Sequence, residues 1–283
     1  MKLDFVKQHG CGNDYIYVNG FVYDIENPSE TAKTLSDRHF GIGADGLIIV
    51  CPSAVCDAKM RMFNADGSEG KMCGNGIRCA AKFAYDSGIC RKNIMRIETL
   101  SGVKTVRLEF SGGEVVGATV DMGAAVFAAE QIPAAAAGEI VARKVTLAGR
   151  EREITCVSMG NPHCVIFVPA DFDLWGFDIE KEGAPIERDA FFPEGVNVEF
   201  VRQIDKAHLQ MRVWERGSGE TLACGTGACA CAAAAIAAGL CGRKVEVLLR
   251  GGALQIEWRE GDRHILMTGP ATTVFEGEMI DEK

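Results

Sequence analysis

The sequence Cys73-Gly74-Asn75-Gly76 recurs 151 positions later as Cys224-Gly225-Thr226-Gly227, and this repeat decides the fold. Matching polar positions flank the two copies, in the pairs Asn64 and Glu215, Glu69 and Glu220, Asn13 and Asn161, and Asp45 and Asn197. The first two pairs keep a constant distance from the cysteine, and the other two have nearly the same separation. A near-constant offset at separated places predicts a duplicated α/β domain.

Short segments of alternating or β-branched residues recur on both sides of the repeat, so strands should dominate. The predicted strands are 14–18, 46–50, 59–63, 104–110, 115–121, 152–158, 163–168, 196–201, 209–215, 245–249, 253–258 and 264–268. Two helices, 77–85 and 228–238, should follow the glycine-rich turns and end near Gly88 and Gly239. The stretch 131–139, with one proline and four alanines, should connect the halves.

The composition is that of a folded, globular protein. The 283 residues are 47% apolar and 24% charged, which suits two domains of roughly 140 residues each. A net charge of −9, with the acidic residues scattered, argues against nucleic-acid binding by phosphate neutralisation. The first ten residues lack the apolar core of a signal peptide, and the weakly polar run 228–240 is shorter than the ~20 residues that span a bilayer. We therefore expect a cytoplasmic protein with no membrane partner.

Twelve cysteines occur without a single Cys-x-x-Cys pair, so structural zinc is not expected and most thiols should be reduced. Eight of them are predicted to be small buried apolar residues, namely Cys11, Cys51, Cys56, Cys90, Cys156, Cys164, Cys231 and Cys241. A dithiol built from Cys73 and Cys79, or from Cys224 and Cys229, would lack the short spacing of thioredoxin-type sites.

The two repeated cysteines fall at predicted helix N-termini, where backbone N–H groups and the helix dipole should lower a thiol pKa. The following glycines allow close approach of a carboxylate to the backbone. One such cysteine would suggest a nucleophile or a tight turn with a buried thiol. Two copies facing each other across a cleft would instead put a thiolate and a thiol on opposite faces of a substrate carbon, which is the minimum needed to invert a stereocentre.

At these residues the chain resembles the diaminopimelate epimerase family. The resemblance rests on HGCGND at 9–14, DRHFGIGADG at 37–46, FNADGSE at 63–69, MCGNGIRC at 72–79, MGNPH at 159–163, VN at 196–197, WERG at 214–217 and ETLACGTG at 220–227. These segments cover nearly the whole chain in family order. The cluster Asp37, Arg38 and His39 within them is expected to hold a loop together.

The resemblance implies a cofactor-independent isomerase, without pyridoxal phosphate or metal, that interconverts LL- and meso-2,6-diaminopimelate in lysine and peptidoglycan-precursor synthesis. It also implies two pseudo-symmetric α+β domains, each a twisted, barrel-like, mostly antiparallel sheet around a central helix, with the active site in the interdomain cleft. The implied domains are 1–120 plus 266–283 and 121–265, and the protein should be a homodimer.

Carried over by motif, Cys73 and Cys224 are the two acid/base residues. The implied substrate ligands are Asn13, Asn64, Gly74, Asn75, Asn161, Asn197, Glu215, Arg216, Gly225 and Thr226. His163 and Glu215 should orient or tune the cysteines, although His163 could equally be a structural histidine capping a turn.

Two positions depart from the family pattern. Some members have a substrate-contacting glutamine where this chain has Gly46, and some have a tyrosine associated with dimer formation where this chain has Phe275. A racemase of proline or histidine is the nearest alternative, but proline-type enzymes have histidine at the place of Asn75 and lack the WERG segment. A relative that only binds ligands would not need two matched thiols.

Overall fold

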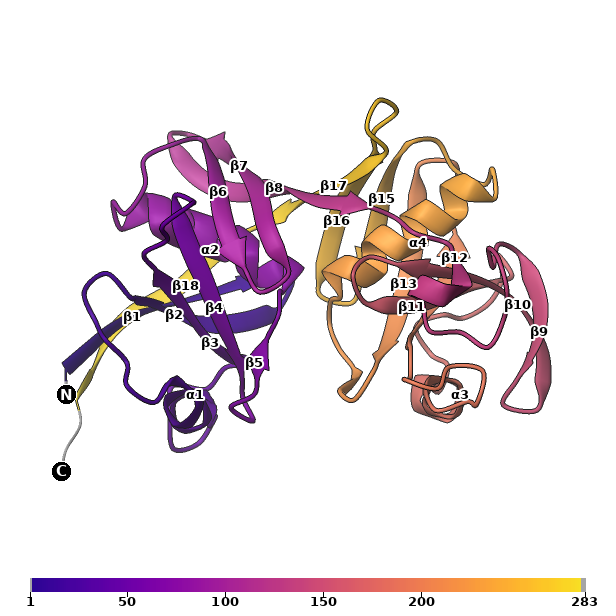
Figure 1. Ribbon diagram of the computed structural model, residues 1–283, viewed down its shortest axis with the longest axis horizontal. Helices are drawn as coiled ribbons and strands as arrows, with labels where there is room; N and C mark the ends of the chain where they lie inside the picture. The colour runs from indigo at the N-terminus through magenta and orange to yellow at the C-terminus, as the bar shows by residue number, and fades with distance from the viewer. Residues whose placement is uncertain (1, 281–283) are drawn as a thin grey trace. The chain divides into compact units, whose positions relative to one another are not determined.

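The computed structural model describes residues 2–280, which form two compact units. The first contains the chain up to Asp121 together with the chain from Thr268 onward, and the second is Met122–Met267. The last strand therefore returns to the unit in which the chain began, as the yellow β18 beside the indigo β1 shows (Figure 1). In the part of the chain that is described, no helix has the length and apolar character needed to cross a membrane.

The first unit is a mixed sheet around one buried helix. Its strands are β1 (Lys2–Gly10), β2 (Asn13–Asn19), β3 (Gly46–Cys51), β4 (Ala58–Asn64), β5 (Glu69–Gly70), β6 (Ile94–Thr99), β7 (Gly102–Ser111), β8 (Glu114–Ala124) and β18 (Thr272–Ile280). Neighbours pair antiparallel except β2 with β3 and β4 with β6, which are parallel. Helix α2 (Gly74–Asp86) contacts β1, β2, β3, β4 and β7, so the sheet curves around it. Helix α1 (Pro28–Ser36) packs against β3 and β4.

The second unit repeats this plan. Its strands are β9 (Arg143–Leu147), β10 (Arg150–Ser158), β11 (Pro162–Val168), β12 (Asn197–Gln203), β13 (His208–Glu215), β14 (Gly219–Glu220), β15 (Lys244–Leu249), β16 (Gly252–Trp258) and β17 (His264–Pro270). The chain passes from one unit to the other within β8 and again within β17. Again two pairs are parallel, β11 with β12 and β13 with β15. The alanine-rich helix α4 (Gly225–Ala237) is apolar on all sides and packs against six strands, as an apolar helix must. Helix α3 (Ile179–Glu187) lies against β12 and β13.

Strand register defines which residues of the two units are equivalent. The parallel pair β2 and β3 sets Tyr15 opposite Gly46, and the parallel pair β11 and β12 sets His163 opposite Asn197. Gly46 is thus the counterpart of Asn197, at the same separation as the two cysteines. The prediction that paired Asp45 with Asn197 was wrong by one residue, a shift that would turn the side chain to the other face of the strand.

Each predicted strand corresponds to an observed one, and both predicted helices are present but begin three residues earlier, at Gly74 and Gly225. Helices α1 and α3 were not predicted, and α3 is masked in the sequence by Pro185 inside it. Strands β1, β5, β6, β9, β14 and β18 were also missed. The stretch 131–139 is not a connection between halves, because it lies inside the second unit with Ile132 fully buried in its core.

All twelve cysteines are free thiols. The eight expected to be buried divide into two groups. Five are buried, namely Cys11, Cys90, Cys156, Cys164 and Cys231. Cys51, Cys56 and Cys241 are only partly buried, which corrects the prediction for these three.

Candidate active site

Two cysteines occupy the same place in the two units. Cys73 is the N-cap of α2 and Cys224 the N-cap of α4, both with extended backbone. The N–H of Gly76 donates to Cys73 Sγ at 3.3 Å. Cys224 has no cap hydrogen bond of this geometry, although the nearby N–H of Gly227 favours its thiolate. Both sulfurs therefore lie at the positive end of a buried helix.

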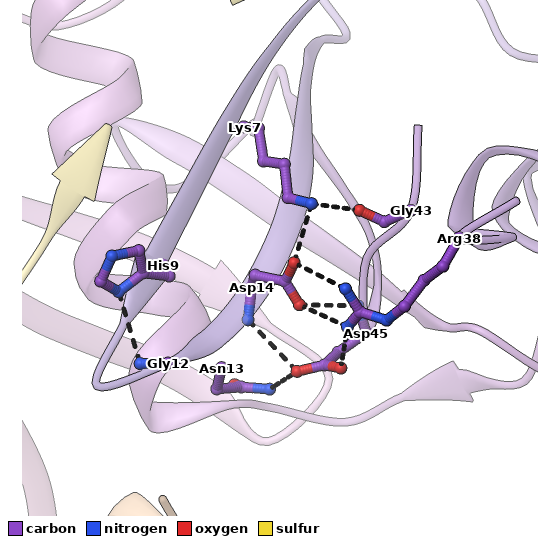
Figure 2. A network of polar contacts seen from close by, with 8 residues as sticks. All are labelled: Lys7, His9, Gly12, Asn13, Asp14, Arg38, Gly43 and Asp45. Carbon is purple, nitrogen blue, oxygen red and sulfur yellow. Dashed lines mark hydrogen bonds and ion pairs between the residues drawn. The ribbon is translucent and has the colours of Figure 1, made fainter. Parts of the chain in front are cut away.

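The Cys73 cluster consists of Cys73, Asn13, Asp45 and Tyr15. The thiol of Cys73 donates to Asn13 Oδ1 at 3.2 Å. Asn13 Nδ2 donates to Asp45 Oδ2 at 2.8 Å, and Asp45 Oδ1 accepts from Arg38 Nη2 at 2.9 Å, as Figure 2 shows. The Asp45 carboxylate thus fixes the amide of Asn13 with its oxygen toward the sulfur.

Asp14 lies next to this cluster, and its backbone N–H donates to Asp45 Oδ2 (Figure 2). It accepts hydrogen bonds from Arg38 and forms an ion pair with Lys7 at 2.9 Å. Burial alone would raise the pKa of Asp14, but the hydrogen bonds and charges of Arg38 and Lys7 more than offset this and lower it. Asp37 accepts from the N–H groups of His39 and Phe40. These contacts agree with the predicted structural role of residues 37–39.

Tyr15 belongs to the Cys73 cluster, and sequence reasoning missed it. It is buried in β2, and its hydroxyl forms a hydrogen bond with Cys73. Burial first, and then the neighbouring thiol, raise the pKa of Tyr15 well above its usual value. Its position two residues after Asn13, on the same face of a strand, was the available signal.

The Cys224 cluster consists of Cys224, Glu215, Thr226, Asn161, His163 and Glu199. The thiol of Cys224 donates to Glu215 Oε2 at 3.2 Å, and the Thr221 hydroxyl donates to Glu215 Oε1. Thr226 Oγ1 lies 3.5 Å from the same sulfur. Glu215, expected both to bind substrate and to support a cysteine, has both carboxylate oxygens engaged beside Cys224.

The expected lowering of the Cys224 pKa is wrong for this structure. Only 6% of Cys224 is exposed, and burial raises its pKa well above the usual value. The charges of Glu215 and Glu199 raise it further, against the opposing effects of Thr226 and the Gly227 N–H. A helix N-terminus alone does not outweigh desolvation with two nearby carboxylates.

His163 connects the Cys224 cluster to a buried acid. Its Nε2 lies 3.1 Å from Asn161 Oδ1, and its Nδ1 lies 2.6 Å from Glu199 Oε1. Asn161 Nδ2 donates to Thr226 Oγ1 at 3.2 Å. Both side chains of the His163–Glu199 pair are fully buried. Sequence reasoning missed Glu199, although an acidic residue in the middle of the apolar strand 196–201 was a usable signal.

The other predicted ligands lie at strand ends: Asn197 begins β12, Asn64 ends β4, and Arg216 directly follows β13. Asn197 is buried, donates to Pro162 O at 2.8 Å and accepts from the N–H of Arg216 at 2.9 Å. The Arg216 side chain is exposed and its Nη1 donates to Glu194 O at 3.0 Å. In the first unit, the Asn64 amide donates to its neighbour Ser68.

The first turn of each helix differs in its side chains. Gly74 and Gly225 are buried at the first helical positions. Asn75 follows Gly74, and its Oδ1 accepts from the fully buried Arg78, whose Nη1 also donates to Gly74 O. In the second unit Thr226 follows Gly225 and faces Cys224 instead. The Asn75 side chain is thus engaged in structure, and its backbone is the part available to a ligand.

The chain is similar to known proteins over nearly its whole length. Diaminopimelate epimerases of Acetivibrio thermocellus and Desulfovibrio desulfuricans are each 52% identical to it, over 97% and 98% of this chain and 98% of each relative. A crystal structure of a hydroxyproline epimerase from Agrobacterium vitis shares the fold, with a TM-score of 0.68 at 15% identity over 98% of this chain and 91% of that one.

The two relatives at 52% identity make the chain an isomerase of the epimerase class. The sequence profile of the family described as diaminopimelate epimerase matches residues 5–128 and 155–274. The chain belongs to the diaminopimelate epimerase family.

Proposed function

We propose that this protein interconverts LL- and meso-2,6-diaminopimelate by moving the α-proton between Cys73 and Cys224. One observation carries the mechanism: the two cysteines cap equivalent buried helices of a duplicated unit, with equivalent strands around them. Duplication preserves the position of the thiol while the surrounding side chains differ. This is what a reaction with two chemically similar but mirror-related proton transfers requires.

In the forward reaction, the thiolate of one cysteine removes the α-hydrogen: the Cα–H bond breaks, an S–H bond forms, and the electron pair is delocalised toward the α-carboxylate. The thiol of the other cysteine then donates its proton to the opposite face of the same carbon. The two sulfurs have exchanged protonation states at the end of one turnover. The reverse reaction uses them in exchanged roles.

The helix N-termini behind the cysteines would stabilise the charge that develops on the carboxylate. The first N–H groups of a helix have no acceptors within that helix, and they point outward at its positive end. Gly74 and Gly225 leave room for a carboxylate to approach these donors. Donors that are fixed before the reaction strengthen as negative charge grows on the carboxylate oxygens.

Arg216 and the asparagines would bind the distal end of the substrate. A guanidinium can bind a carboxylate through two parallel hydrogen bonds. The backbone N–H of Arg216 donates to Asn197, and its guanidinium donates to Glu194 O, so within residues 2–280 the side chain is positioned without a carboxylate partner. The amides of Asn13, Asn64, Asn161 and Asn197 would bind the remaining ammonium and carboxylate groups.

We also propose a cellular role and an oligomeric state for the protein. The enzyme would act in the cytoplasm, without pyridoxal phosphate or metal, in the synthesis of lysine and peptidoglycan precursors. It would be a homodimer, with β18 as the candidate interface, because Val274 and Phe275 on this strand are 52% and 44% exposed.

The test is ¹H NMR of the purified protein in D₂O with LL-diaminopimelate, after treatment with EDTA and without pyridoxal phosphate. We expect loss of the α-proton signal together with appearance of the meso isomer. Proline, hydroxyproline and histidine are the comparison substrates. If the α-proton of one of these amino acids exchanged and that of diaminopimelate did not, the substrate of the protein would be that other amino acid.

A further inference from the structure

Glu199 is a fully buried carboxylate that the proposed reaction does not use directly. Its Oε1 contacts His163, and its Oε2 is buried without a hydrogen-bond partner in the described residues. A half-satisfied buried acid is unfavourable for folding. The fold does not require it, because strand register makes Ile48 the counterpart of Glu199 and Tyr15 the counterpart of His163. An acid retained here is therefore expected to serve the site.

The hydrogen bonds in the Cys224 cluster have a definite direction. Asn161 Oδ1 can only accept, so His163 Nε2 must donate to it. Nδ1 of the same ring lies 2.6 Å from Glu199 Oε1, so the carboxyl group of Glu199 holds the edge of the ring opposite Asn161. Asn161 Nδ2 donates to Thr226 Oγ1, which leaves the Thr226 hydroxyl hydrogen to point at the sulfur of Cys224.

We propose that Glu199 is a positioning residue for Cys224: through its contact with Nδ1, it keeps a hydrogen of His163 on Nε2, facing Asn161, and so orients Asn161 and Thr226 so that the Thr226 hydroxyl donates to the Cys224 thiolate. The proposal rests on the proposed function, in which this sulfur must carry a negative charge for part of each turnover. With an amide in place of the Glu199 carboxyl group, the hydrogen of His163 can lie on Nδ1 instead of Nε2. The amide of Asn161 would then reverse, and Thr226 would donate to it instead of to the sulfur.

Two effects of Glu199 on Cys224 have opposite signs, and this makes the proposal testable. The charge of Glu199 by itself raises the pKa of Cys224, whereas the hydrogen bond from Thr226 lowers it. Burial raises the pKa of Glu199 itself, against the effect of His163. The titratable groups on the Glu199 side of the sheet are His163 on β11, Glu215 on β13, and Cys224 and Cys231 on α4.

The experiment compares alkylation of Cys224 and Cys73 by iodoacetamide, followed by mass spectrometry across neutral and mildly alkaline pH. In Glu199→Gln we expect Cys224 to react about tenfold more slowly, the value of one hydrogen bond to a charged group, with Cys73 unchanged. Faster reaction would mean that Glu199 acts only as a charge. An unchanged rate would mean that it is merely structural, and either result overturns the proposal. Glu182→Gln is the control, because Glu182 pairs with arginines elsewhere in the same unit.

A double-mutant cycle tests the route of the effect. Thr226→Val removes the last donor of the chain and should slow Cys224 alkylation by itself. If Glu199 acts through Thr226, adding Glu199→Gln to this variant should change the rate no further. Additive effects would contradict the proposed route.

A third measurement uses the unmodified protein, in case the Glu199 variant does not fold. The ¹⁵N NMR signals of the His163 ring should show a hydrogen on Nε2 at neutral pH, and an unprotonated Nε2 would overturn the proposal. None of these readouts requires turnover. Failure of the α-proton exchange assay would therefore reject the proposed function and leave this result to be judged separately.

Discussion

The Cys73 and Cys224 clusters place the same residue at the same point of the same fold but support it differently. Cys73 is partly exposed, and its neighbour Asn13 is held by a carboxylate and an arginine close to the surface. Cys224 is buried beside Glu215 and backed by a fully buried pair of histidine and acid. A duplicated backbone thus conserves where the thiol lies, while its side-chain neighbours determine how tightly it holds a proton.

The largest expected effect tests whether both clusters are needed. Cys73→Ala and Cys224→Ala should each lower kcat/KM for epimerisation about a thousandfold, because each face of the α-carbon needs its own proton carrier. NMR of stereoisomer formation measures this, with circular dichroism to check folding. Cys79→Ala and Cys231→Ala, buried thiols in the same two helices, are the controls. A near-normal rate of epimerisation in Cys73→Ala or in Cys224→Ala would show that the cluster around that cysteine is dispensable.

The next largest effect is on the free energy of unfolding, because the two units have different residues at equivalent positions of α2 and α4. Arg78 is buried and donates to Gly74 O, Asn75 Oδ1 and Pro270 O, whereas its counterpart on α4 is Cys229. Arg78→Ala should lower the free energy of unfolding by about 3 kcal/mol, because several buried acceptors lose their donor, and Cys229→Ala by about 1 kcal/mol.

Urea unfolding can assign that loss to one unit, because all three tryptophans lie in the second. The Arg78→Ala variant should shift the circular dichroism transition and leave the main tryptophan transition in place. A shift of the tryptophan signal by the same amount would mean that the two units unfold together.

A smaller effect is expected for binding. Arg216 follows the end of β13, and its counterpart after β4 is Ala65, so only the second unit offers a cation there. Arg216→Lys should raise KM for diaminopimelate about tenfold, since lysine cannot form the paired hydrogen bonds of a guanidinium. Thermal stability should change little, and Ala65→Ser is the matched control. Unchanged kinetics would place the distal carboxylate elsewhere.

The smallest effect is a difference in how the two units respond to acid. The pKa of Asp14 is lowered in the folded protein. Its stabilising contribution is therefore present above the unfolded value of about 3.9 and is lost as pH falls through the folded value. Arg38→Met should reduce this acid sensitivity, and the remaining part is due to Lys7. Urea unfolding by circular dichroism at several pH values measures it, and an unaltered pH dependence would show that the Arg38 contact is too weak to matter.

Glu199 should show the opposite sign. Its folded pKa is raised, so its charged form is disfavoured by folding, and acidification from neutral pH toward the unfolded value of about 4.3 relieves that penalty. Glu199→Gln should remove this gain, so the free energy of unfolding of wild type minus that of the variant should increase as pH falls. Tryptophan fluorescence reports it from the second unit. A decrease of this quantity on acidification would mean that Glu199 is held as a well-compensated anion.

The sequence by itself determined the duplication, most strands of both units, and the placement of Cys73 and Cys224 at helix N-termini. These features depend on local patterns: glycines after a cysteine, alternation of apolar residues, and a repeat at constant offset. Only the tertiary structure revealed strands such as β1 and β18, which pair residues from opposite ends of the chain. It also revealed Tyr15 and Glu199 beside the thiols, and the raised pKa of Cys224. Burial and the identity of neighbours decide these properties, and both arise from residues far apart in sequence, so no local pattern contains them.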